Sequence, residues 1–211
     1  ADLEERQFNL RLCTPVRKQF EKIGTEFPFG LRLLTANLWL FGPLFMRIMA
    51  KTNMGNAMMR TTTAATMFEG SQAHNVLAPK ASAIVNFRLL PGETVEDVMN
   101  HIQRIAGRQK VVLEPMMPDE PSLISPTDSD SFGRIENLIN EVFPGVLTTP
   151  FLMIGGTDSR RYEKVSRNIY RFSPMQVHKT DLDRIHNVNE RISFQNIERS
   201  VQFFHRLVSD L

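Results

Sequence analysis

The sequence has 211 residues, and its 25 basic and 23 acidic residues give a formal net charge of +2 at pH 7. A chain of this length can bury a hydrophobic core and form one or two domains. It contains no stripe of basic residues that would suggest a nucleic-acid partner and no acidic run that would suggest a disordered tail. Its single cysteine, Cys13, excludes an internal disulfide and a cysteine-rich zinc module, but it does not define the cellular compartment.

The most hydrophobic window, residues 33–46, is interrupted by Asn37 and by Gly42-Pro43. A helix that spans a membrane needs roughly 20 apolar residues, so we expect no membrane span here. The N-terminal residues lack the basic, apolar and small-residue regions of a signal peptide. Because the first residue is Ala1 rather than Met, we expect the chain to be an artificial truncation, a processed product or a piece of a longer protein.

Helices are predicted for most of the first 60 residues. Residues 15–23 begin with a proline, which is favoured in the first turn of a helix. Residues 31–50 favour a helix that is broken or kinked at its Gly-Pro pair, because proline inside a helix removes a backbone hydrogen bond. Residues 54–59 indicate a loop or a short helical turn, and the polar residues 1–11 indicate the frayed end of an earlier helix.

The following segment predicts the order strand, strand, helix, strand, which is most of a ferredoxin-like domain. Residues 61–68 are rich in Thr and Ala and favour a strand, whereas residues 81–90 alternate apolar and polar side chains as a half-buried strand does. Thr94 is the predicted N-cap of a helix whose apolar residues recur at helical spacing. Residues 110–117 predict a further strand, and the prolines after it indicate a linker.

The rest of the chain alternates helices and strands, which favours an α/β layer. We predict an amphipathic helix at 131–143, strands at 151–154 and 168–172, and a long final helix from Ser193. The side chains expected to be buried on the final helix are Phe194, Ile197, Val201, Phe204, Val208 and Leu211. Residues 151–154 are apolar and run straight into two glycines, as a buried parallel strand does where its carboxyl end opens into a site.

Glycines and polar side chains follow the predicted strand at 151–154. They are Gly155, Gly156, Thr157, Asp158 and Arg160. The glycines allow positive φ and close approach of the backbone, and the polar side chains then face whatever binds there. Downstream, His186 is flanked by Asp183 and Glu190. Physical reasoning alone predicts a polar site at the end of a strand.

Two motifs resemble the dizinc aminoacylase/carboxypeptidase family of metallopeptidases. One is Gly-Gly-Thr-Asp-Ser-Arg at 155–160, followed by Arg-Ile-His-x-x-Asn-Glu-Arg-Ile at 184–192. The other is Asn-Val-Leu at 75–77, followed by a strand that ends in Arg88, which is similar to the lid, or dimerisation, domain of that family. The resemblance covers nearly the whole chain and is nearest to members that act on N-acyl amino acids.

The resemblance implies a mixed α/β fold in two parts. Residues 1–120 would form an incomplete ferredoxin-like lid or dimerisation domain that lacks its first strand and helix. Residues 121–211 would form the C-terminal part of an α/β zinc-peptidase catalytic domain. A homodimer through the lid domain is implied as well.

The resemblance also implies roles for single residues. His186 stands in the position of a metal ligand, for which neutral imidazole suits zinc, and Asn187 replaces a family glycine at a turn that needs a residue tolerant of left-handed backbone. Arg88 would hold the substrate's free carboxylate with its fork of N–H donors, and Asn75, lent by the partner subunit, would contact the reacting carbonyl. The alternatives are an exposed strand residue for Arg88 and a turn former for Asn75.

Gly155, Gly156 and Thr157 resemble the loop that lines the family's substrate site. Asp158 would orient neighbouring groups and Arg160 would assist with the substrate's anionic end, with a structural ion pair as the alternative for both. The apolar segment 38–41 predicts core or lid packing, and its alternative is the border of an acyl pocket.

Most of the catalytic machinery of that family is missing from the sequence. The family uses a His-x-Asp pair, a bridging Asp and a Glu-Glu pair whose first member is the general base. No His-x-Asp occurs, and the Glu4-Glu5 pair lies at the start of the chain. A general base must lie within hydrogen-bond reach of the water that it activates, so we expect no activity from this chain alone.

Two hypotheses from different classes therefore stay open. The preferred one is a portion of a metal-dependent amidohydrolase or carboxypeptidase that cleaves N-acyl amino acids or small peptides with two divalent metal ions, zinc by the resemblance. The alternative is a non-catalytic dimerisation or interaction module. The sequence determines neither the acyl group and amino acid of the substrate, nor the native metal, nor the compartment.

Overall fold

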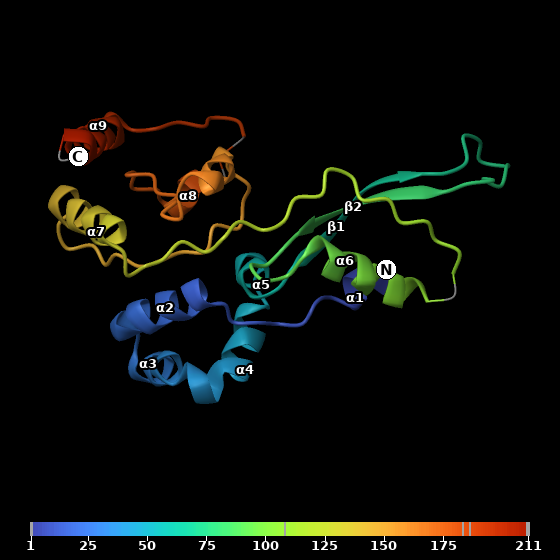
Figure 1. Cartoon of the computed structure of the whole chain (residues 1–211), viewed down its shortest axis with the longest axis horizontal. Helices are drawn as coiled ribbons and strands as arrows, with labels where there is room; N and C mark the ends of the chain where they lie inside the picture. The colour runs from blue at the N-terminus through green and yellow to red at the C-terminus, as the bar shows by residue number, and fades with distance from the viewer. Residues whose placement is uncertain (1, 108, 183, 186, 210–211) are drawn as a thin grey trace. The chain divides into compact units, whose positions relative to one another are not determined.

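The computed structural model in Figure 1 describes residues 2–107, 109–182, 184–185 and 187–209. The chain divides into two compact units, of which the first contains residues 1–124 and 151–156 and the second contains residues 125–150 and 157–211. Helices together with a small antiparallel sheet confirm the predicted mixed α/β class. The domain boundary at residue 120 stays a prediction, because compactness alone assigns no function to either unit.

Most of the regular structure belongs to the first unit. Its elements are α1 (Asp2–Glu5), α2 (Thr14–Ile23), η1 (Gly24–Glu26), α3 (Phe29–Ala36), α4 (Leu38–Met49), α5 (Asn53–Met59), β1 (Thr62–Glu69), β2 (Ser82–Arg88) and α6 (Val95–Ala106). The elements of the second unit are α7 (Asp130–Val142), η2 (Asp158–Lys164), α8 (Lys179–Leu182) and α9 (Phe194–Ser209). Helices α2, α6, α7 and α9 confirm the helices predicted at these places.

The single helix predicted over 31–50 is two helices, and the break lies at Asn37 rather than at the Gly-Pro pair. The side-chain amide of Asn37 donates to the backbone oxygen of Leu33 at 2.9 Å and ends α3, while its own backbone oxygen accepts from Leu40 N–H at 3.0 Å and begins α4. Pro43 stays inside α4. Within the described residues no single helix is long and apolar enough to cross a membrane, although α3 and α4, bent by 115°, pass together by length and composition.

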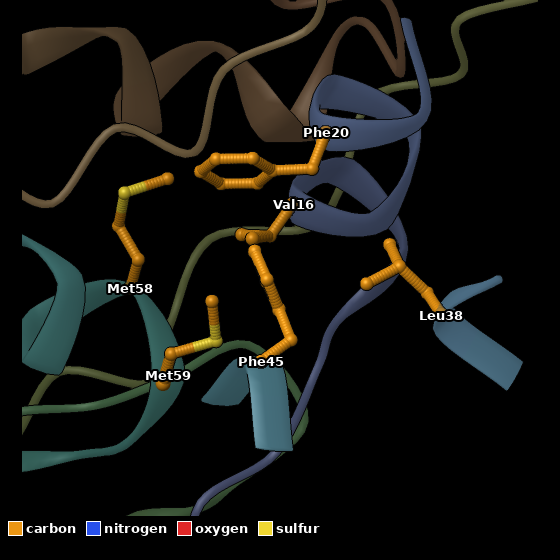
Figure 2. Close-up of a cluster of buried hydrophobic side chains, with 6 residues drawn as sticks. All are labelled: Val16, Phe20, Leu38, Phe45, Met58 and Met59. Carbon is orange, nitrogen blue, oxygen red and sulfur yellow. The ribbon is translucent and has the colours of Figure 1, made fainter. Parts of the chain in front are cut away.

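The core of the first unit lies between α2, α4 and α5. Figure 2 shows its buried side chains, which are Val16, Phe20, Leu38, Phe45, Met58 and Met59. The rings of Phe20 and Phe45 pack edge to face with their centroids 4.8 Å apart. Gly24 lets η1 approach α3 closely, because a Cβ there would lie 2.2 Å from the hydroxyl oxygen of the buried Thr35. This core takes up only one face of α4.

Strands β1 and β2 form a long antiparallel hairpin, whose tip at residues 70–81 points away from α5 and α6 in Figure 1. Thr62 pairs with Arg88 at the base of the hairpin. Val85 and Phe87 are half-buried while their neighbours along β2 are exposed, which confirms the predicted alternation.

Helix α6 begins with a capping box. The Thr94 hydroxyl accepts from the Asp97 N–H at 3.1 Å and the Asp97 carboxylate accepts from the Thr94 N–H at 2.9 Å, which confirms the predicted N-cap. The strand predicted at 110–117 is wrong, because the structure describes this segment throughout and it pairs with no other strand. Pro115 has no N–H to donate and Val112 is 83% exposed, so the segment has neither the donors nor the burial of a sheet strand.

The second unit packs α7 against α9 around four buried side chains: Leu138, Ile139, Phe143 and Phe203. The stripe predicted to be buried on α9 is wrong over the described residues, since Phe194 is 90% exposed and Val201 is 63% exposed. Leu211, the last member of that stripe, lies outside the described residues. The face of α9 that carries Phe203 packs against α7 instead. Which apolar face of a helix becomes buried depends on the partner that it meets, and periodicity alone does not supply that partner.

The strand predicted at 168–172 is also absent from this fully described segment. The Ser125 hydroxyl accepts from the Ile169 N–H at 3.0 Å and donates to the Ile169 backbone oxygen at 2.7 Å. One side chain thereby satisfies the two backbone groups that a neighbouring strand would otherwise pair. The Tyr170 hydroxyl donates to the backbone oxygen of Pro126 at 2.6 Å and holds the same two segments together.

Candidate substrate-binding site

Arg88 connects the two motifs that the sequence singles out. It is the last residue of β2, and its Nη1 donates to the backbone oxygen of Ile154 at 3.0 Å, across 66 positions of sequence. Ile154 directly precedes the glycine pair, and both partners belong to the first unit. The bond uses one of the five N–H donors of the guanidinium, so it positions this exposed side chain and leaves donors for an anion.

The segment 151–154 is described throughout and forms no strand, which corrects the prediction of a buried parallel strand. Leu152 and Ile154 pack against the core of the first unit, whereas Phe151 and Met153 are 46% and 42% exposed. Four consecutive apolar residues suggest burial on both sides, but a strand also needs a neighbour for its backbone hydrogen bonds. Side-chain packing on the helical core holds the segment instead.

Glycine allows a positive φ, but Gly155 and Gly156 do not adopt one. The described glycines with positive φ are Gly92, Gly107 and Gly145. Among the described residues, a Cβ at Gly156 would meet no atom within 4 Å, and one at Gly155 would meet only the Met153 sulfur at 4.0 Å. Neither backbone strain nor a neighbouring atom of the described residues therefore explains the glycine pair, and its role in the close approach of a ligand stays a prediction.

Thr157, Asp158 and Arg160 belong to the second unit. Thr157 is the N-cap of η2, and its hydroxyl oxygen lies 2.5 Å from the Ser159 hydroxyl. The ion pair that Asp158 makes is with Arg161, at 3.7 Å, and both side chains are more than four-fifths exposed. Such an exposed pair contributes little to stability. Arg160 is half-buried, and its backbone N–H donates to the Thr157 oxygen at 3.4 Å.

Asn75 lies in the connection between β1 and β2. The Ser71 hydroxyl donates to the Ala73 oxygen at 2.9 Å, and the Val76 N–H donates to the same oxygen at 3.3 Å, so the connection turns tightly at this point. Asn75 itself is exposed, and Leu77, two residues later, is 95% exposed. This geometry agrees with a turn former, and contact with a partner subunit stays a prediction.

His186 and Asp183 lie outside the described residues. Asn187 is described, and its side-chain oxygen accepts from the Val188 N–H at 2.7 Å. Asn189 has a left-handed φ of 63°. That Asn187 takes over the backbone conformation of a family glycine stays a prediction, because its φ also involves His186, which lies outside the described residues.

A family model for the peptidase dimerisation domain matches residues 3–113, which is more than half of the chain. The chain belongs to this family of M20 peptidases. The matched residues of the dimerisation domain contain Asn75 and Arg88, whereas residues 155–160 and His186 lie beyond them. The family predicted from the two motifs is thereby confirmed.

Curated relatives extend the likeness of this M20 chain over nine-tenths of its length. The N-fatty-acyl-amino acid synthase/hydrolases of Xenopus tropicalis and Homo sapiens are 41% and 38% identical over 93% and 90% of the chain. The probable carboxypeptidase S-like 2 of Dictyostelium discoideum is 35% identical over 92% of it. The chain spans 38% of the length of each of these relatives. No solved structure matches the chain.

The part of the M20 chain that the structure describes does not supply a metal site. In it no three His, Cys, Asp or Glu side chains come together as ligands. A catalytic zinc needs about three protein ligands and a water. The His, Cys, Asp and Glu side chains of the described residues therefore do not form a dizinc centre by themselves.

Sequence reasoning missed Arg171, whose Nε donates to the Thr157 hydroxyl oxygen at 3.1 Å. The signal in the sequence is a basic residue inside the apolar segment 168–172, for which the sequence predicts a strand. The described groups with shifted pKa lie elsewhere in the dimerisation domain. Burial raises the pKa of the Cys13 thiol and lowers the pKa of Arg60, and the Thr94 N–H and hydroxyl lower the pKa of Asp97.

Proposed function

We propose that this chain is part of a metal-dependent hydrolase that cleaves the amide bond of N-acyl amino acids or small peptides. In this proposal the chain supplies the site for the substrate's free carboxylate and the contact between two subunits. The hydrogen bond between Arg88 and the Ile154 oxygen is the observation that carries it, because this bond places a cationic fork next to the Gly155-Gly156 backbone. The names and identities of the relatives support the same substrate class.

Arg88 would bind the carboxylate through two parallel hydrogen bonds, as guanidinium groups do. The bare backbone of Gly155 and Gly156 would let the substrate approach without meeting a side chain. Thr157, Asp158 and Arg160 follow in sequence and would complete the polar lining. Asn75, at the tip of the hairpin, would reach the site of a partner subunit in a homodimer.

We infer two divalent metal ions for the complete enzyme, zinc by the family resemblance, with His186 as one ligand. The other ligands and the general base would come from residues that this chain does not contain. The sequence encoded upstream of Ala1 tests this directly. A His-x-Asp pair and a Glu-Glu pair there are expected, and a coding region without them would favour the non-catalytic dimerisation module.

A second experiment measures the chain and the complete protein side by side. The 211-residue chain, supplied with zinc or manganese, should not hydrolyse N-acyl amino acids, because it lacks the base. In the complete protein, His186→Ala should remove one metal ion per subunit while the circular dichroism spectrum stays unchanged. His205→Ala, on the exposed side of α9, is the matched control and should keep the metal content of the wild type. Equal metal content in all three proteins would contradict the assignment of His186 as a ligand.

A further inference from the structure

Helix α4 is apolar well beyond its buried face. Leu38, Gly42 and Phe45 are buried, and Figure 2 shows Leu38 and Phe45 among the core side chains. Around the rest of the helix, Trp39 is 75% exposed, Leu40 55%, Leu44 50% and Ile48 48%. A helix that is hydrophobic all round is normally enclosed by protein or by lipid. Here the core of the first unit encloses only one side of it.

Helix α3, which precedes α4 in the chain, also exposes large apolar side chains. Its exposed large side chains are Phe29 at 72%, Leu31 at 53% and Leu33 at 48%. The two helices meet at a 115° bend, so residues 29–49 form an elbow rather than one rod. We call this segment the α3–α4 elbow. Its helices are too short to cross a bilayer singly, but a bent apolar element of this size can lie in one leaflet.

The charges around the elbow distinguish between the surfaces that could cover it. Residues 27–68 contain no Asp or Glu and four basic residues, Arg32, Arg47, Lys51 and Arg60, although the whole chain is nearly neutral. Two elbows that packed together would bring like charges close, which disfavours a second copy as the occupant. A surface with negative charge above an apolar layer complements both features, and anionic lipid bilayers have this structure.

We propose that the α3–α4 elbow docks this protein on anionic lipid bilayers. Trp39, Leu40 and Leu44 enter the boundary between headgroups and acyl chains, where tryptophan is favoured. The exposed Arg32, Arg47 and Lys51 contact the lipid phosphates and carboxylates. The elbow lies on the bilayer without spanning it. This surface is separate from the proposed carboxylate site at Arg88 and does not depend on the proposed enzyme activity.

Trp39 is the only tryptophan of the chain, so its fluorescence reports on the elbow directly. The 211-residue chain is mixed with vesicles of phosphatidylcholine, with or without phosphatidylserine. With phosphatidylserine, the emission should shift to shorter wavelength and the protein should sediment with the vesicles. Added salt should weaken the binding, and lipids brominated on their acyl chains should quench the emission.

Substitutions separate the contribution of the apolar side chains to vesicle binding from that of the basic side chains. Leu40→Glu with Leu44→Glu should abolish sedimentation with vesicles. Arg32→Gln with Arg47→Gln changes only exposed charges and should weaken partitioning roughly tenfold or more, since each basic residue near an anionic surface contributes about a fivefold factor. Val201→Glu on α9, where the wild-type side chain is 63% exposed, is the matched control and should bind as the wild type does. Circular dichroism checks that each variant keeps its helices.

Three results would overturn the proposal. The first is an unchanged Trp39 emission in the presence of phosphatidylserine vesicles. The second is an equal loss of vesicle binding for Val201→Glu and for the elbow variants, which would show that exposed apolar residues bind lipid wherever they lie on the protein. The third is an emission already shifted to short wavelength without lipid, which would show that protein covers the elbow.

Discussion

Arg88 is the residue at which the strand of the dimerisation domain meets the segment that leads into the glycine pair. Its bond to the Ile154 oxygen is made by an exposed side chain to a neutral acceptor, so its net contribution to stability is about 1 kcal/mol or less. The value of this arginine to the protein would therefore be in what its remaining donors bind. A lysine in its place would keep the charge and lose the planar fork.

We expect Arg88→Lys, in the complete enzyme, to lower kcat/KM roughly 10- to 100-fold for substrates with a free carboxylate, because hydrogen bonds to charged groups contribute about 1.5–3 kcal/mol each. The same change should have little effect on the corresponding amides. Steady-state kinetics on acid and amide pairs measure this difference. Arg104→Lys is the matched control, since Arg104 also donates to a backbone oxygen, that of Asn100, on α6. Equal losses on acids and amides would show that Arg88 is a structural residue.

At the scale of single elements, α6 shows how a helix begins. Thr94 and Asp97 satisfy each other's backbone N–H groups, which a helix start otherwise leaves without an acceptor. The Thr94 N–H, and then its hydroxyl, hold the pKa of the Asp97 carboxyl below its usual range. Because the pKa is lower in the folded protein, the carboxylate stabilises the folded state above the ordinary value of about 3.9 and loses this effect as the pH falls through the folded pKa.

We expect Thr94→Ala to lower the free energy of unfolding by about 1 kcal/mol at pH 7, the usual cost of a lost N-cap. Asp97→Asn should remove the part of the stability that the wild type loses in acid. Urea unfolding, followed by circular dichroism at neutral and acidic pH, measures both effects. Glu96→Gln changes a carboxylate of the same helical turn outside the capping box and serves as the control. An Asp97→Asn protein with the same loss of stability in acid as the wild type would contradict this account.

At the scale of the whole molecule, the two compact units are not two continuous halves of the sequence. Residues 151–156 come late in the chain and belong to the first unit, where Leu152 and Ile154 pack on its core and Arg88 binds the Ile154 oxygen. The connection at 115–128 contains no helix or strand, although the structure describes it throughout. Its Met117 is 89% exposed and has a φ of 45°, which non-glycine residues seldom adopt.

We expect limited proteolysis to cut the chain between residues 115 and 128. The two products should still elute together in size-exclusion chromatography, because residues 151–156 of the second product remain packed in the first unit. Leu152→Asp should release them from each other, since it places a charge against the apolar core. Met153→Asp, at the exposed neighbouring position, is the control and should not. First cuts elsewhere, or products that separate in the wild type, would contradict this description.

Short sequence patterns correctly predicted those features that depend on a few neighbouring residues, such as the start of a helix or the alternation along a strand. Proline and Thr94 marked the starts of α2 and α6, and alternation along β2 identified its half-buried face. The paired motifs identified the family, because they record the residue types and spacing of a site and not its geometry. Of the candidate site, the sequence selected Arg88 and the glycine pair, but not the bond from Arg88 to the segment before them.

Tertiary structure alone decided which apolar segments pair and which faces are buried. Residues 110–117, 151–154 and 168–172 all look like strands, yet none of these described segments pairs with a neighbouring strand. On α9 the contact with α7 buries Phe203 and leaves the regular apolar stripe exposed. The periodicity of a segment shows which of its side chains are apolar and on which face they lie. Whether that face is buried, or the segment pairs as a strand, depends on which distant segment packs against it.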